Sequence, residues 1–219
     1  MDTIIQLENI TKYYRNGKVI NKVLDGFSHS FKTNCFTVLA GPSGSGKSSL
    51  LNILATLDTP NGGTYLLEGN AVDFTNKRHL TDIRKENFGF VFQSFNLIPV
   101  LNALENVELP LTLFPYSSED RRVMAEKALI LVGLKDKLTS HPDEMSGGEQ
   151  QRVAIARAIA RSPKIVFADE PTANLDKRNA IHIIELMQEL NVNEGVNFII
   201  ASHDDKVIHA GKDVLLLGE

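Results

Sequence analysis

The stretch Gly41-Pro42-Ser43-Gly44-Ser45-Gly46-Lys47-Ser48 decides how the rest of this sequence is interpreted. It lies between a short apolar run, Cys35–Ala40, typical of a buried strand, and a helix expected over about Lys47–Leu57. The glycines let successive backbone N–H groups face phosphate oxygens, the lysine supplies a positive charge, and the Ser48 hydroxyl can bind Mg²⁺. The alternative is a flexible Gly/Ser turn with a solvated lysine, but the flanking strand and helix favour a phosphate-binding loop.

The composition is that of a globular chain without a strong basic surface. Its 219 residues have a mass of 24.2 kDa, 42% hydrophobic residues, a net charge of −4 and a pI near 5.9. This balance argues against a nucleic-acid partner and against direct attachment to an acidic membrane. The single cysteine, Cys35, fits a reducing cytosol. The start does not resemble a signal peptide, and no apolar run approaches the roughly 18 residues of a membrane helix, so any membrane role is expected through a partner.

Strand-like and helix-like segments alternate along the chain. Strands are expected at Thr64–Glu68, Phe88–Phe92, Lys164–Ala168 and Val196–Ala201, a turn at Asn61-Gly62-Gly63, and helices at Glu149–Arg161 and Ile181–Leu190. Apolar residues at helical spacing from Asn102 to Lys137 indicate a mostly helical lobe. The buried side of the helix after the phosphate loop is expected to carry Leu50, Leu51, Ile53, Leu54 and Leu57. This alternation implies a parallel sheet with its ligand at the carboxyl ends of the strands, after Ala40, Ala168 and Ala201.

Two carboxylates, Asp169 and Glu170, follow the strand expected at Lys164–Ala168. Asp169 would hold Mg²⁺ through water, and Glu170 would polarise an attacking water as a general base. The alternative is an acidic strand end at a helix N-terminus, which is common. The phosphate loop upstream favours the catalytic interpretation.

A second anion-binding turn is expected in Ser146-Gly147-Gly148-Glu149-Gln150-Gln151-Arg152. A serine and two glycines before a helix can present backbone N–H groups to a phosphate. The simpler interpretation is an N-capping serine with a flexible entry. One phosphate loop and a second such turn in the same chain raise the question of whether two copies share a nucleotide.

Four single residues are candidates for supporting roles, each with a structural alternative. Gln93 could reach the metal or the water, or be an exposed loop amide. His203 could donate to a terminal phosphate, or be structural. Tyr14 could stack on a base, or pack in the core or on the surface. For Asp176 the structural interpretation is a cap on the helix of residues 177–190 and nothing more.

Taken together, these motifs in this order resemble the ATP-binding-cassette (ABC) ATPases over nearly the whole chain. The signature at Ser146–Glu149, between the phosphate loop and Asp169-Glu170, is the specific element of the resemblance. Three further stretches are similar to the branch that serves lipoprotein release, macrolide export and related peptide-efflux pumps: Phe90–Pro99, Ala103–Pro110 and Pro171–Asp176.

The resemblance implies a P-loop NTPase fold of α/β class. It consists of a RecA-like parallel sheet core, a small antiparallel β subdomain and an inserted α-helical subdomain. Residues 1–219 would form one ABC ATPase domain, with the core at about 1–93 and 164–219 and the helical subdomain at about 94–163.

The resemblance also implies roles for individual residues, with ATP and Mg²⁺ as cofactors. Tyr14, with Tyr13 as the fallback, would stack on adenine. Gln93 would bind Mg²⁺ and sense the membrane partner. Glu170 would be the base and His203 the γ-phosphate switch, and Asp176 would communicate across a dimer. The other implied sites are the phosphate loop (Gly41, Pro42, Ser43, Gly44, Ser45, Gly46, Lys47, Ser48, Ser49), the metal ligands Ser48 and Asp169, and the signature that closes on the other protomer's nucleotide (Ser146, Gly147, Gly148, Glu149).

The implied partners are a second copy, joined by ATP, and a transmembrane permease subunit of the FtsX/MacB-like type. The chain would be cytoplasmic and peripheral at the cytoplasmic face of the inner (plasma) membrane through that partner. The residues themselves suggest where it docks, because Ile98–Leu101 offers an apolar surface just after Gln93. The function would be export or lipoprotein release. The alternatives are an ATP switch that drives a membrane protein acting on cell-wall machinery, and a DNA-repair or chromosome ATPase. The latter needs a coiled coil that the residues between Gln93 and Lys164 are too few to supply.

The sequence departs from the family pattern at three places. Glu149 stands where the family most often has Gln, and Ser49 replaces the usual Thr. The chain ends at Gly218-Glu219, so the last strand is expected to be trimmed. None of these departures removes a catalytic group.

Overall fold

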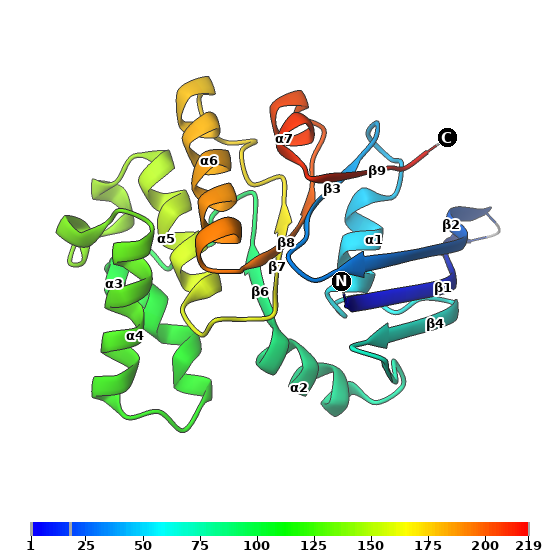
Figure 1. Cartoon of the computed structure of the whole chain (residues 1–219), viewed down its shortest axis with the longest axis horizontal. Helices are drawn as coiled ribbons and strands as arrows, with labels where there is room; N and C mark the ends of the chain where they lie inside the picture. The colour runs from blue at the N-terminus through cyan, green and yellow to red at the C-terminus, as the bar shows by residue number, and fades with distance from the viewer. Residues whose placement is uncertain (1, 18, 219) are drawn as a thin grey trace. The chain divides into compact units, whose positions relative to one another are not determined.

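The computed structural model describes residues 2–17 and 19–218, so Met1 and Glu219, the ends of the predicted domain, lie outside the described residues. The chain forms two compact units. The first comprises residues 1–87 and 199–219, and the second residues 88–198 (Figure 1).

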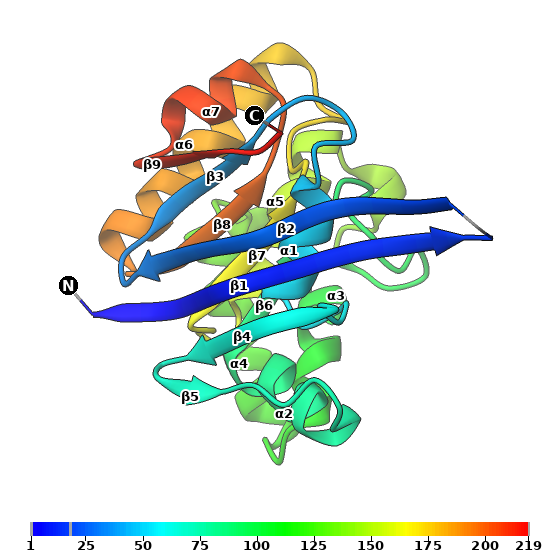
Figure 2. The same cartoon turned by 90° about the vertical axis from the view of Figure 1, so that its right-hand side faces the viewer.

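An antiparallel sheet forms one layer of the first unit, with strand order β2-β1-β4-β5 (Figure 2). Its strands are β1 (Thr3–Asn16), β2 (Val19–Lys32), β4 (Gly62–Leu67) and β5 (Asn70–Ala71). Ile5 pairs with Phe31 on one side and Leu67 on the other, and all three side chains are buried. The small antiparallel subdomain implied by the resemblance is therefore confirmed.

The predicted turn at Gly62-Gly63 is wrong, because both glycines belong to β4. Gly63 has φ +97°, and a Cβ there would lie 2.6 Å from the Asn9 carbonyl oxygen. The glycine is needed for this close approach to β1 rather than for a turn.

The second sheet is the parallel one, with strand order β6-β7-β8-β3-β9. Its strands are β3 (Phe36–Ala40), β6 (Phe88–Val91), β7 (Ile165–Asp169), β8 (Asn197–Ala201) and β9 (Asp213–Leu216). Every residue of β3 and β8 is buried, which is typical of parallel strands covered on both faces. In the first unit β9 pairs with β3, from Thr37 opposite Asp213 to Ala40 opposite Leu216, so the last strand is present with four residues.

The helices of the first unit are α1 (Lys47–Leu54), α2 (Lys77–Asn87) and α7 (Asp205–Ala210). The helix predicted to reach Leu57 ends three residues earlier. Thr56 has φ 54°, which an α-helix cannot accommodate, and the Arg84 guanidinium donates to its carbonyl oxygen at 2.7 Å. Leu57 is therefore 51% exposed, and its predicted place in the core is wrong.

The helices of the second unit include the predicted helical lobe. They are α3 (Ala103–Glu108), α4 (Ser118–Leu131), α5 (Gly147–Ile159) and α6 (Lys177–Asn193), with 3₁₀ turns at Leu109–Leu113, Lys135–Lys137 and Pro142–Glu144. Helices α3, α4 and α5 pack on one another (Figure 1). The α5 helix begins at Gly147 rather than Glu149, because Ser146 is its N-cap. No helix among residues 2–17 and 19–218 combines the length and apolar character needed to cross a bilayer.

Candidate functional site

The phosphate-binding loop surrounds the Lys47 side chain. Strand β3 ends at Ala40, the loop follows, and α1 begins at Lys47 itself. The lysine is only 8% exposed, and its Nζ donates to the carbonyl oxygens of Gly41 at 2.8 Å and Pro42 at 2.9 Å. These partners are neutral, so the full positive charge is available to an anion that enters the loop.

Close packing explains the glycines of this loop. Gly41 has φ +148°, and a Cβ there would lie 2.4 Å from the Leu217 carbonyl oxygen beyond β9. Gly46, the N-cap of α1, has φ +95°, and its Cβ would meet the Val23 side chain of β2 at 2.8 Å. The loop is thus held between β2 and the segment that follows β9, and only glycine fits at these two positions.

Tyr14 lies beside the helix that follows the loop. Its hydroxyl donates to Asp58 Oδ2 at 2.8 Å and lies 3.2 Å from Ser49 Oγ, one residue after Ser48 in α1. The side chain remains 43% exposed. Tyr13, the fallback, has its backbone N–H bound to Asn61 Oδ1 at 2.9 Å. The described contacts therefore bring Tyr14 to the phosphate loop.

His203 follows β8 and is exposed. The N–H of Ser202 donates to the Leu39 carbonyl oxygen at 3.1 Å, so this segment runs beside the end of β3. Asp204 caps the short helix α7 and accepts from the Lys206 N–H at 2.9 Å. His203 is thus placed at the same end of the sheet as the start of the phosphate loop, as predicted for the carboxyl ends of parallel strands.

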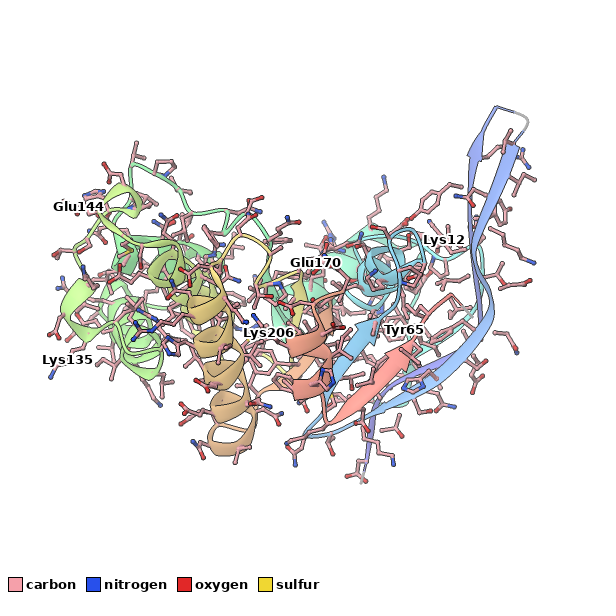
Figure 3. The ribbon with its side chains drawn as sticks, turned by 90° about the horizontal axis from the view of Figure 1, so that it is seen from above. Lys12, Tyr65, Lys135, Glu144, Glu170 and Lys206 are labelled. Carbon is pink, nitrogen blue, oxygen red and sulfur yellow. The ribbon has the colours of Figure 1, made fainter. Side chains whose placement is uncertain are left out.

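In the second unit, Asp169 is the last residue of β7 and Glu170 follows it directly (Glu170 is labelled in Figure 3). Glu170 has φ 45°, a left-handed conformation that costs energy in a residue other than glycine. The turn is fixed by the Ala173 N–H, which donates to the Glu170 carbonyl oxygen, and by Gln151 of α5, whose buried amide donates to the Pro171 carbonyl oxygen at 2.7 Å. This bond joins the signature helix to the carboxylate turn.

The segment around Gln93 is held by two residues that the sequence analysis did not single out. Asn174 Nδ2 donates to the Gln93 carbonyl oxygen at 3.0 Å. Arg157 of α5 donates to the carbonyl oxygens of Asn96 at 2.6 Å and Phe95 at 2.7 Å. Both acceptor residues have positive φ, 57° for Phe95 and 51° for Asn96, so the guanidinium stabilises an unfavourable backbone. Burial lowers the pKa of Arg157 from its ordinary value. The sequence did contain a signal for Arg157, because it is the one charged residue in the otherwise apolar run Val153–Ile159.

The signature serine forms a capping box with Glu149. Ser146 Oγ accepts from the Glu149 N–H at 3.3 Å, and the carboxylate accepts from the Ser146 N–H at 2.8 Å and hydroxyl at 2.9 Å. The hydrogen bond from the Ser146 backbone lowers the pKa of the Glu149 carboxyl below its ordinary value, despite opposition from burial. Gly148 is packed so closely that a Cβ would lie 2.7 Å from Asn179 Oδ1 of α6. Ser146 therefore caps α5, as in the simpler interpretation of the sequence, and its role toward a partner's nucleotide stays a prediction.

Asp176 is the N-cap of α6. Its Oδ1 accepts from the N–H groups of Arg178 and Asn179, both at 2.9 Å. The hydrogen bond from the Asn179 backbone is the main cause of the lowered pKa of the Asp176 carboxyl. The structure shows the capping role, and communication across a dimer stays a prediction.

The donor types predicted to bind Mg²⁺ are a hydroxyl, an amide and a carboxylate, from Ser48, Gln93 and Asp169. These are hard oxygen ligands of the kind that Mg²⁺ combines with phosphate oxygens and water. Among the residues that the structure describes, no group of three or more His, Cys, Asp or Glu side chains forms an alternative metal site.

Comparison with known proteins places this geometry in a family. A family model described as "ABC transporter" matches residues 24–173. The chain is 42% identical over 219 residues to MJ0796, an uncharacterized ABC transporter ATP-binding protein of Methanocaldococcus jannaschii, with 98% of this chain and 93% of that protein covered. It is also 42% identical over 204 residues to the macrolide export ATP-binding/permease protein MacB of Brucella melitensis, with 93% of this chain and 31% of MacB covered.

The likeness extends to solved structures. A dimeric structure of MJ0796 superposes with a TM-score of 0.86 at 41% identity, with 97% of this chain and 94% of that chain covered. A dimeric structure of its post-hydrolysis state, bound to ADP and Pi, gives a TM-score of 0.86 at 40% identity, with the same shares covered. The predicted P-loop NTPase fold is thus confirmed. The chain belongs to the ABC transporter family, as an ABC ATPase that is the ATP-binding subunit of a transporter.

The capping box predicts a measurable pH dependence. A carboxyl whose pKa is lowered by folding stabilises the protein above its unfolded pKa of about 4.3, and this stabilisation is lost as the pH falls through the folded pKa. We expect Glu149→Gln to lower the melting temperature by about 1–2 °C at pH 7 and by less at pH 3.5, in thermal denaturation followed by circular dichroism. The control is Glu185→Gln, at an exposed position on α6. If the difference in melting temperature between Glu149→Gln and the parent were the same at pH 7 and pH 3.5, this account would be contradicted.

Proposed function

We propose that the chain binds ATP with its phosphates in the Gly41–Ser49 loop and its adenine against Tyr14. The observation that carries the proposal is the Lys47 ammonium enclosed by carbonyl oxygens of its own loop. An entering triphosphate offers negatively charged oxygens in place of these neutral acceptors, so the ammonium gains the attraction of an opposite charge. The bond between Tyr14 and Ser49 supports a base site within reach of the same helix.

Hydrolysis in this proposal needs Mg²⁺. Ser48, Gln93 and Asp169 are the residues that would hold it, and the ion would supply positive charge for the phosphate oxygens. Glu170 orients the attacking water and accepts its proton on the carboxylate, while His203 donates a hydrogen bond to the γ-phosphate. The water oxygen bonds to the γ-phosphorus as the bridge to the β-phosphate breaks, and ADP and phosphate leave. The left-handed backbone at Glu170 supports this role, because a residue held in an unfavourable conformation belongs to a turn of fixed geometry.

We propose that two copies of the chain close around ATP, with Ser146, Gly147, Gly148 and Glu149 of one copy facing the γ-phosphate held by the other. The dimeric structures of MJ0796 support this arrangement by similarity. In the single chain, the Ser146 hydroxyl donates to Glu149 and would turn to the phosphate when the copies close. Asp176 would then lie where the copies communicate.

We propose that the transporter's membrane subunit, a permease of the FtsX/MacB-like type, docks on the exposed segment Ile98–Leu101. Val100 is 80% exposed and Ile98 36% exposed, in an apolar segment with no charged residue. Buried Asn106 fixes the segment, since it accepts from the Ile98 N–H at 2.8 Å and donates to the Leu101 carbonyl oxygen at 2.9 Å. The MacB relatives are named macrolide export ATP-binding/permease proteins, which supports an export role. Lipoprotein release is the other role we propose, in either case at the cytoplasmic face of the plasma membrane. Residues 94–163 would be the helical subdomain that couples this surface to the ATPase core.

The general-base role is tested by Glu170→Gln. Without the carboxylate the water keeps its proton, so we expect turnover to fall by about 10²–10⁴-fold while ATP still binds. The variant should therefore accumulate as an ATP-bound dimer in light scattering with ATP and Mg²⁺, whereas Glu185→Gln should hydrolyse ATP like the parent. A Glu170→Gln chain that stays monomeric under these conditions would count against the sandwich of two copies.

The docking surface is tested by placing charge on it. We expect Val100→Glu and Leu101→Glu to reduce the amount of chain bound to membranes of the source cell by about tenfold, because burying a carboxylate against an apolar partner is unfavourable. Basal ATPase activity should persist. Val192→Glu is the matched control, because Val192 is 68% exposed on α6, away from this segment in the sequence. Normal binding of both docking variants in quantitative immunoblots would place the permease elsewhere.

A further inference from the structure

A connected polar cluster in the first unit is formed by four side chains, those of Lys12, Tyr14, Ser49 and Asp58. Lys12 Nζ donates to Asp58 Oδ1 at 2.7 Å and to the Thr59 carbonyl oxygen at 2.8 Å. The Tyr14 hydroxyl donates to the second oxygen of the same carboxylate at 2.8 Å and lies 3.2 Å from Ser49 Oγ. The cluster therefore joins strand β1 to the turn after α1 and to α1 itself (Lys12 is labelled in Figure 3).

The lysine of this cluster is unusually buried for its type. Lys12 is 6% exposed, although lysine is almost never fully buried unless it is paired. Burial by itself raises the pKa of the Asp58 carboxyl, but the hydrogen bonds from Lys12 and Tyr14 outweigh it, so the pKa lies below its ordinary value. Asp58 is therefore a carboxylate at neutral pH, and it fixes the lysine and the tyrosine together.

The arrangement makes the two faces of the Tyr14 ring different. The Lys12 Nζ lies over the ring, 4.7 Å from its centroid, in a cation–π contact. Tyr14 as a whole residue is still 43% exposed, which leaves room for a flat partner beside the side chain. The hydroxyl is tied to Ser49 and Asp58, which prevents the ring from swinging away from the helix that begins at Lys47.

We propose that Lys12 and Asp58 are positioning residues for the nucleotide base: they fix the Tyr14 ring so that its open face receives the base while the triphosphate occupies the loop. The inference rests on the proposed function, because it assumes that Tyr14 stacks on the base. A platform fixed before binding loses less conformational freedom on binding than a mobile one, which favours affinity. Lys12 and Asp58 lie outside the Gly41–Ser49 loop, so we expect changes at these two residues to act on the base and not on the phosphates.

The test compares ATP with inorganic tripolyphosphate, which has the phosphates without the base. We expect Asp58→Asn and Lys12→Met to weaken ATP binding about 5–10-fold in calorimetry and to leave tripolyphosphate binding unchanged, within the range set by base–aromatic stacking. Tyr14→Phe keeps the ring and loses the tether, so it should weaken ATP binding similarly. Combined with Asp58→Asn it should add little, because both changes break the same bond. In steady-state kinetics the main effect should fall on KM for ATP rather than kcat.

Two controls separate the possible failures. Asp25→Asn removes the carboxylate of an exposed pair with Lys22 on the same sheet and should bind ATP like the parent. Tyr14→Ala tests the proposed base site itself. If Tyr14→Ala leaves the ratio of ATP to tripolyphosphate affinity unchanged, the base site and this inference both fail. If Tyr14→Ala lowers that ratio while Tyr14→Phe, Asp58→Asn and Lys12→Met do not, the positioning role is overturned and the base site stands. Tyr14→Phe changes a partly exposed side chain, so it keeps the test valid if the Lys12 variant does not fold.

Discussion

The enclosure of the Lys47 ammonium by its own loop is the interaction on which the rest of the molecule depends. A buried charge needs partners, and here the carbonyl oxygens of Gly41 and Pro42 provide them without neutralising it. That geometry requires a glycine at position 41, because Leu217 approaches too closely for a Cβ. Leu217 is held there because its N–H donates to the Ala40 carbonyl oxygen after β9 has paired with β3. The parallel pairing of the last strand thus shapes the loop that begins at the end of β3.

In the second unit, helix α5 holds irregular segments in place. Its Gln151 donates to the turn that follows Glu170, and its Arg157 donates to the segment after Gln93. Ser146 begins the same helix. A shift of α5 would therefore be felt at the predicted base, the predicted sensor and the predicted partner-facing serine together. Because one helix contacts all of these segments, α5 is the element through which the proposed docking surface would be coupled to ATP hydrolysis.

The elements that the sequence predicted well are those with a strong local signal. The parallel sheet was predicted from the apolar runs at β3, β7 and β8. The glycine-rich loop after β3 indicated that the ligand site lies at the carboxyl ends of the strands. The long strands β1 and β2 did not follow from periodicity, because shifts of register between Leu7 and Ile10 and between Ile10 and Lys12 interrupt the alternation. The partners of Lys12 and Arg157 could not be predicted either, since Asp58 lies 46 residues away and Asn96 61 residues away. Contacts of this range depend on the fold and not on a local pattern.

The most direct test of the account is a calorimetric titration of ATP with Mg²⁺ into the parent chain and into Lys47→Ala. The account predicts that the parent binds ATP and that the variant loses this binding, because the loop then offers no ammonium to the terminal phosphates. Circular dichroism should show that the variant remains folded, since alanine favours the start of α1 at least as well as lysine. Equal ATP affinity in the two chains would contradict the assignment of Gly41–Ser48 as the phosphate-binding loop, and with it the site built around that loop.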